Sequence, residues 1–172
     1  MRWKIAKNTA AFSGHRIIGK TELAHVKNAL DETIGTLFGK GITQFLVGGA
    51  VGFDTLAAMA VLTAREANPT IRLLMALPCT DQDSRWRESD KTTYRYLLNN
   101  ADEIIYVSEQ PYFRGCMVQR NIYLVERSSI LIAYLTHGRS GTGQTVIFAH
   151  EKGLTVINLA KSHKRGWKNG TL

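Results

Sequence analysis

The chain is poor in the residues that mark several protein classes. It has only two cysteines, Cys79 and Cys116, and neither belongs to a C-x-x-C pair. They offer no zinc framework and suit a reducing compartment. Only three residues are proline, which argues for a compact globule rather than a disordered segment. No apolar run approaches the roughly 20 residues that a membrane span needs. We therefore expect a protein without a membrane partner.

Two common nucleotide motifs are also missing. The sequence contains neither a G-x-G-x-x-G dinucleotide fingerprint nor the G-x-x-x-x-G-K-[ST] loop that cradles nucleotide phosphates. Its histidines show no metal-ligand spacing. We accordingly expect no metal site and no resident cofactor.

What is present fits one globular domain. The 172 residues, 44% of them hydrophobic, can bury roughly two-thirds of the unfolded surface in a single core. We expect this domain at residues 1–160. Lys7 and Asn8 interrupt any signal-like apolar stretch near the start, which favours a cytoplasmic protein.

Half of the net charge of +8 lies at the end of the chain. Residues 161–172 form a predicted basic, flexible tail that carries four cations and no acid: Lys161, Lys164, Arg165 and Lys168. Such a tail is either a solvated, solubilising end or a non-specific grip on nucleic acid or another polyanion.

Three glycine-bearing turns each follow an apolar, strand-like run. Glycine lets backbone approach a ligand closely, and amides at the start of a following helix point at anions. The first, second and third glycine turns are Ser13-Gly14-His15-Arg16, Gly48-Gly49-Ala50-Val51-Gly52-Phe53-Asp54 and Gly138-Arg139-Ser140-Gly141-Thr142-Gly143. If they lie at one edge of a parallel sheet, they form a phosphate cradle.

Hydrophobic periodicity alternates along the chain between strand-like and helix-like segments. It predicts strands near 9–12, 43–47, 71–77, 102–107, 129–135 and 154–159, and helices near 20–38, 54–64, 83–98, 118–126 and 144–151. This order predicts an α/β fold, a single-domain Rossmann-like three-layer sandwich with a mostly parallel central sheet. Ligands of such sheets sit outside the carboxyl ends of the strands, where the strand order reverses.

Several side chains near the turns suit an anionic ligand. Arg16 and Arg120 could grip phosphate, and their alternative role is a surface salt bridge. Asp54 and Thr142 are divided between capping a helix and contacting the ligand. His15 could bind phosphate or move a proton, or simply pack within its turn.

Other side chains suit a base. Tyr112 lies in a loop and Trp86 on the third predicted helix, where flat rings beside cations favour base stacking. Core packing is the commoner use of a residue such as Trp86. Gln82 could bond a base edge or help to start the helix.

In this order, the segments resemble the YpsA-like branch of the SLOG superfamily, Rossmann-like proteins that include DprA and the LOG enzymes. The likeness runs from about Ala10 to Leu159. The first two glycine turns resemble the opening motifs of the branch, and the third is similar to its GGT-type last turn, although Arg139 and Ser140 depart from the glycine pair. The remaining two signatures correspond to Gln82 with Trp86, Asp90 and Tyr94, and to Tyr112 with Met117, Arg120 and Asn121.

The resemblance implies a nucleotide or nucleotide-derived ligand at the strand ends, which the protein would bind or sense. One alternative is a LOG-like hydrolase of nucleoside monophosphates, but Thr145 stands where the LOG pattern has its glutamate, so we expect no base release. Another is DprA-like binding of single-stranded DNA, which the basic surplus favours. A homodimer is compatible with the sequence, and nothing in it requires one.

Overall fold

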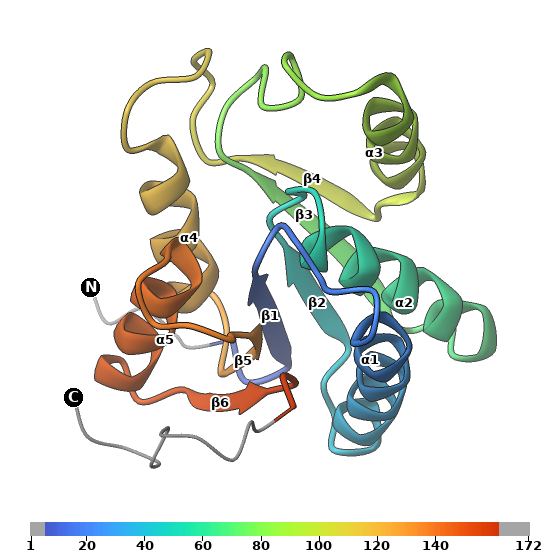
Figure 1. Cartoon of the computed structure of the whole chain (residues 1–172). Helices are drawn as coiled ribbons and strands as arrows, with labels where there is room; N and C mark the ends of the chain where they lie inside the picture. Colours follow the sequence, from blue (N-terminus) through green and yellow to red (C-terminus); the bar gives the residue numbers. More distant parts are fainter. Residues whose placement is uncertain (1–5, 162–172) are drawn as a thin grey trace.

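The computed structural model describes residues 6–161 and shows strands and helices in strict alternation (Figure 1). The strands are β1 (Thr9–Gly14), β2 (Gln44–Val47), β3 (Arg72–Leu77), β4 (Glu103–Tyr106), β5 (Ile130–Tyr134) and β6 (Thr155–Asn158). The helices are α1 (Leu23–Gly39), α2 (Phe53–Ala67), α3 (Glu88–Asn100), α4 (Cys116–Glu126) and α5 (Gly141–Glu151). Except for Lys161, the predicted basic tail lies outside the described residues.

All six strands are parallel and form one sheet in the order β4-β3-β2-β1-β5-β6. The chain first builds the sheet outward from β1 to β4 and then returns to add β5 on the other side of β1. Ala10 accordingly pairs with Phe45 of β2 and with Ile130 of β5. The strand order therefore reverses between β1 and β5, which makes their carboxyl ends the expected ligand position.

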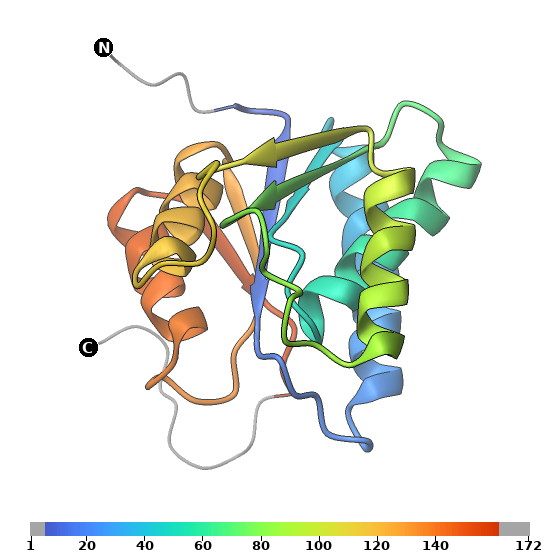
Figure 2. The same ribbon diagram turned by 90° about the horizontal axis from the view of Figure 1, so that it is seen from above.

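Helices cover both faces of this sheet. α1, α2 and α3 lie on one face, and α4 and α5 lie on the other (Figure 2). Successive side chains of β1 point to opposite faces of the sheet. Phe12 therefore packs in the core beneath α1 to α3, and Ala11 packs in the core beneath α4 and α5. The structure thus confirms the predicted Rossmann-like three-layer α/β sandwich.

Helix starts differ from the prediction: α4 and α5 begin two and three residues early, at Cys116 and Gly141, and the first and third helices begin late. The third helix begins at Glu88 rather than near Asp83, because tight turns first bond Ser84 N to Asp81 O and Trp86 N to Asp83 O. Trp86 therefore precedes α3 and does not lie on it. The first helix begins at Leu23 rather than Lys20, so the first glycine turn leads into a loop instead of directly into a helix. Among the described residues, no helix is long and apolar enough to cross a membrane.

Candidate functional site

The three glycine turns share one edge of the sheet, as predicted. They follow β1, β2 and β5, which are adjacent in the sheet and all point the same way. Ser13 and Gly14 belong to the last part of β1 and pair with Ala133 and Tyr134 of β5. The first turn therefore occupies the centre of the edge, with the second and third turns on either side.

The first and second turns are in direct contact. Phe53 N donates a 3.1 Å hydrogen bond to the carbonyl oxygen of His15, and the ring of Phe53 occupies the space that a side chain on Gly14 would need. Gly52 has a positive φ of 85° and lies against the backbone of Arg16. Only glycine fits here, because an added Cβ would overlap the carbonyl oxygen of Arg16.

The first turn is joined through a histidine to the short segment between β5 and the third turn. Nε2 of His15 accepts a 2.9 Å hydrogen bond from the backbone N–H of Thr136. The His15 ring also stacks on His137, with ring centres 4.1 Å apart and planes 7° from parallel. The sequence did not single out His137, although its place between β5 and the third turn was a usable signal.

The third turn starts α5 directly. Its cap is Ser140, whose hydroxyl accepts a 3.0 Å hydrogen bond from Gly143 N, so Thr142 is buried in the first turn and is not the cap. The first turn of α5 contains no acidic residue. The backbone amides of Gly141 and Thr142 bond no described residue, as expected for the first amides of a helix.

The second turn is held by a buried charge pair. Arg120 of α4 donates through Nη1 to the carbonyl oxygen of Gly48 at 2.6 Å, and its Nη1 lies 4.0 Å from Oδ2 of Asp54. Nε of Arg120 donates to Oδ1 of the neighbouring Asn121 at 2.9 Å. Both members of the pair are buried, so the surface salt bridge considered for Arg120 is wrong.

Asp54 is also not the cap of α2, because Gly52 holds that position. Its Oδ2 instead accepts a 3.1 Å hydrogen bond from Ala50 N, within the second turn. Burial raises the pKa of Asp54, while Arg120 and the Ala50 amide oppose that rise. Burial likewise lowers the pKa of Arg120, but a guanidinium is basic enough to stay charged. The start of α2 therefore already holds a carboxyl group of its own.

The candidate base-contacting residues occupy the β3 and β4 side of the edge. Gln82 is buried, donates to the hydroxyl of Tyr94 at 3.0 Å, and lies 3.4 Å from the carbonyl oxygens of Gly48 and Gly49. Trp86 is half-buried and meets the ring of Tyr94 edge-on. Tyr112 is 62% exposed, and its backbone N–H donates to Oδ1 of Asp81. Of the two aromatic candidates, Tyr112 has the more accessible ring.

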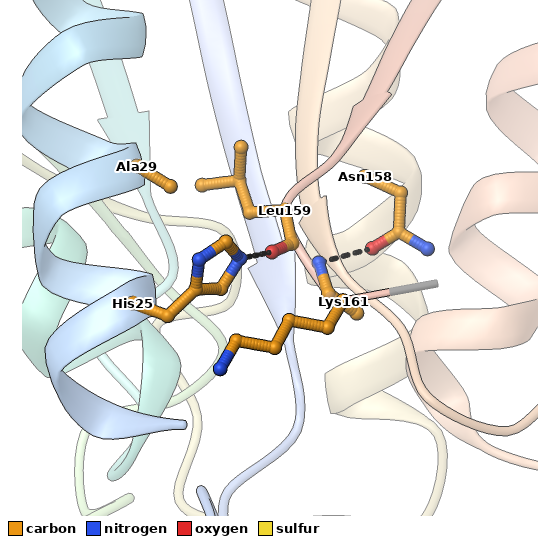
Figure 3. A pocket seen from close by; sticks show the side chains of 6 residues that line it. His25, Ala29, Asn158, Leu159 and Lys161 are labelled. Atoms are coloured by element: carbon orange, nitrogen blue, oxygen red, sulfur yellow. Dashed lines mark hydrogen bonds between the residues drawn. The ribbon is translucent and has the colours of Figure 1, made fainter. Parts of the chain in front are cut away.

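A hollow of about 590 Å³ opens at the same edge, between the start of α1 and the end of β6 (Figure 3). Nε2 of His25 lies 3.0 Å from the carbonyl oxygen of Leu159, and Lys161 is exposed beside them. Asn158 bonds both backbone groups of Leu135, which fixes the chain just before the third turn. The sequence did not single out these residues, but a polar residue ending the last strand was a signal for Asn158.

Two further expectations concern chemistry. No group of three potential metal ligands occurs within residues 6–161. Thr145 lies within α5, and its hydroxyl donates a 2.8 Å hydrogen bond to the carbonyl oxygen of Gly141. The position that would carry a hydrolase glutamate therefore contributes to the helix itself.

The parallel sheet, its reversed strand order and the helices on both faces place the chain among Rossmann-like α/β proteins. Residues 18–152 match the family described as the YspA SLOG family (YpsA), and the chain belongs to that family. The resemblance seen in the sequence is thereby confirmed.

Individual relatives agree with this assignment. The chain is 27% identical over 121 residues to a UPF0398 protein of Halalkalibacterium halodurans, an alignment covering 70% of this chain and 64% of that protein. It is 31% identical over 117 residues to the SPbeta prophage-derived protein YoqJ of Bacillus subtilis, and this alignment covers 62% of this chain and 68% of that protein. This chain thus spans slightly less than two thirds of the length of the first relative.

A solved structure shows the same fold. DNA processing protein A from Helicobacter pylori, whose structure is described by its single-stranded DNA binding mode, superimposes with a TM-score of 0.64 at 19% identity. The match covers 88% of this chain and 64% of that one. At this level of identity, the likeness establishes a common architecture.

Proposed function

We propose that the protein binds a nucleotide or a nucleotide-derived ligand at the carboxyl ends of β1 and β5. The observation that carries this proposal is the start of α5. It lies at the point where the strand order reverses, and the amides of Gly141 and Thr142 there bond no residue of the described range 6–161. Its first turn has no acidic residue. Partial positive charge at a helix start favours a phosphate there.

The neighbouring turns add suitable groups. Arg16 is exposed and makes no hydrogen bond or ion pair with any described residue, so its guanidinium is free to bond phosphate oxygens in pairs. Arg120, by contrast, is occupied with Gly48, Asn121 and Asp54 and serves mainly to hold the second turn. The start of α2 is the poorer phosphate position, because Asp54 already supplies a carboxylate there.

A thermal-shift screen with AMP, ADP and NAD tests this function. A probe at 100 times its dissociation constant should stabilise the folded protein by about 2.7 kcal/mol. Arg16→Ala should weaken the response, because it removes charged hydrogen bonds to phosphate, whereas Arg95→Ala on the exposed face of α3 should leave it unchanged. A wild-type protein that responds to none of the three probes would count decisively against the proposal.

Single-stranded DNA is a second candidate ligand, and one observation favours it. Exposed arginines continue beyond the reversal point along the same edge, with Arg85 and Arg87 after β3 and Arg114 after β4. The exposed ring of Tyr112 lies in the same loop as Arg114. A row of cations with an aromatic ring suits a single DNA strand, because the cations can bond its phosphates and the ring can stack on its bases.

Filter binding to an oligothymidylate across a salt series tests the second candidate. If the edge binds the strand, affinity should survive removal of residues 161–172, and the logarithm of the binding constant should fall with slope about −0.7 per phosphate neutralised. Replacing Arg85, Arg87 and Arg114 together by alanine should reduce that slope. Binding that disappears with residues 161–172 would refute a role for the sheet edge.

A further inference from the structure

His15 is fixed in place from three directions at the reversal point. Its backbone N–H donates to the carbonyl oxygen of Tyr134 at 3.3 Å, and its own carbonyl accepts from Phe53 N at 3.1 Å. Its ring bonds Thr136 N, stacks on His137 and meets the Tyr134 ring edge-on at 5.9 Å. The imidazole is therefore oriented before any ligand arrives.

These contacts also fix where the ring proton lies. A backbone N–H can only donate, so Nε2 of His15 must offer a lone pair to Thr136. A neutral imidazole with a bare Nε2 carries its hydrogen on Nδ1. A second ring proton would lie on Nε2 and point at the amide hydrogen of Thr136, so the two hydrogens would repel each other. In addition, burial and the adjacent His137 lower the pKa of His15, which favours the neutral ring.

The Nδ1–H of His15 is an unused donor. It makes no hydrogen bond with any described residue, and the ring geometry directs it away from Thr136. Arg16 follows it in the chain, and the free amides of α5 follow β5 on the neighbouring strand. An oriented donor in such a place costs little further ordering when a ligand binds.

We propose that His15 donates a hydrogen bond from Nδ1 to an anionic oxygen of the ligand, and that the Thr136 amide holds the imidazole in the tautomer which this requires. The inference rests on the proposed nucleotide site and assigns one phosphate-facing contact within it. His15 thus recognises the ligand as a neutral donor, while Arg16 supplies the positive charge. His137 supports the ring by stacking.

The tautomer can be tested without any ligand. Long-range nitrogen–carbon NMR correlations of the histidine rings in the free protein at pH 7.5 should show His15 with a protonated Nδ1 and a bare Nε2. The His15 signals would be assigned as the set of histidine ring signals that is absent from the spectrum of His15→Gln. A His15 ring protonated on Nε2, or on both nitrogens, would overturn the inference and leave the proposed function standing.

Two substitutions then separate the two ring nitrogens. Glutamine at position 15 can place its amide oxygen near the Nε2 position and keep the bond from Thr136, but it lacks a donor at the Nδ1 position. Asparagine can place an amide N–H near the Nδ1 position and gives up the bond from Thr136. The loss of one hydrogen bond to a charged oxygen should weaken binding by about 10- to 100-fold in His15→Gln. In His15→Asn the binding affinity should fall by less than about fivefold.

The measurement is isothermal titration with AMP, ADP and NAD, and the control is His150→Gln, which lies exposed in the last turn of α5. The control should bind as the wild type does. If His15→Gln also binds as the wild type does, or if His15→Asn is the weaker variant, the assigned contact is wrong. If the wild type binds none of the three probes, the proposed function fails and the inference fails with it.

Discussion

Arg120→Ala should lower the free energy of unfolding by about 3–5 kcal/mol, the usual cost of removing one partner of a buried ion pair. The guanidinium of Arg120 satisfies the carbonyl oxygen of Gly48 and faces the carboxylate of Asp54 in a site that excludes water. Alanine leaves that carboxyl buried and without its main counter-charge. Urea denaturation followed by circular dichroism measures the change.

The same variant should show a characteristic pH dependence. Without the guanidinium, the pKa of the folded Asp54 carboxyl rises further above its unfolded value, so the folded state takes up a proton first as the pH falls. The difference in free energy of unfolding between the wild type and Arg120→Ala should therefore become smaller as the pH falls. The double variant Asp54→Asn with Arg120→Ala should lose less than the sum of the two single variants.

Arg95→Ala is the matched control, because Arg95 is exposed on α3 and makes no ion pair with a described residue. It should change the free energy of unfolding by no more than about 0.5 kcal/mol. If Arg120→Ala cost as little as this control, the charge pair would have no part in holding the second turn.

The architecture could be predicted because the signals that specify it are local. The strands of a doubly covered sheet are nearly continuous apolar runs, as in 71–77, and each is followed by a helix with apolar residues at three- and four-residue spacing. Alternation of the two favours parallel strands, and parallel strands place every turn after a strand at one edge. The common edge of the three glycine turns follows from this alone.

The details of the site depend on contacts between distant segments. Nothing local to Arg120 shows that it bonds the carbonyl oxygen of Gly48, 72 positions earlier, rather than lying at the surface. Likewise, His15 meets His137 only because β5 pairs with β1, and the order of strands in the sheet is not written in any one segment. The first contact occupies the Arg120 guanidinium, and the second helps to orient the His15 ring.

Helix starts were the other source of error. Asp83 and Ser84 are of the residue types that favour a helix cap, and they predicted a start five or four positions before Glu88. In the structure, two consecutive tight turns occupy this segment, and Arg87 is extended before the helix begins. The residue types alone do not separate a helix cap from a turn here, because Asp and Ser favour both.

Gly52→Ala should be among the most destabilising single-methyl additions in the chain, at about 2–6 kcal/mol from backbone strain and overlap together. The backbone of Gly52 has φ 85° and ψ −121°, a conformation that residues with a Cβ avoid. The added methyl would also overlap the backbone of Arg16, which cannot rotate aside as a side chain could. The first and second turns would be forced apart, and Arg16 would move with them.

Two other glycines separate these effects. Gly41 shares a positive φ of 93° but has no atom within 4 Å of an added Cβ, so Gly41→Ala should cost only the strain, about 1–2 kcal/mol. Gly35 lies within α1 with open space around it, and Gly35→Ala should stabilise the protein by about 0.5–1 kcal/mol. Denaturant unfolding of the three variants should rank them in this order. If Gly52→Ala were no worse than Gly41→Ala, the close approach of the first two turns would not be what requires glycine at position 52.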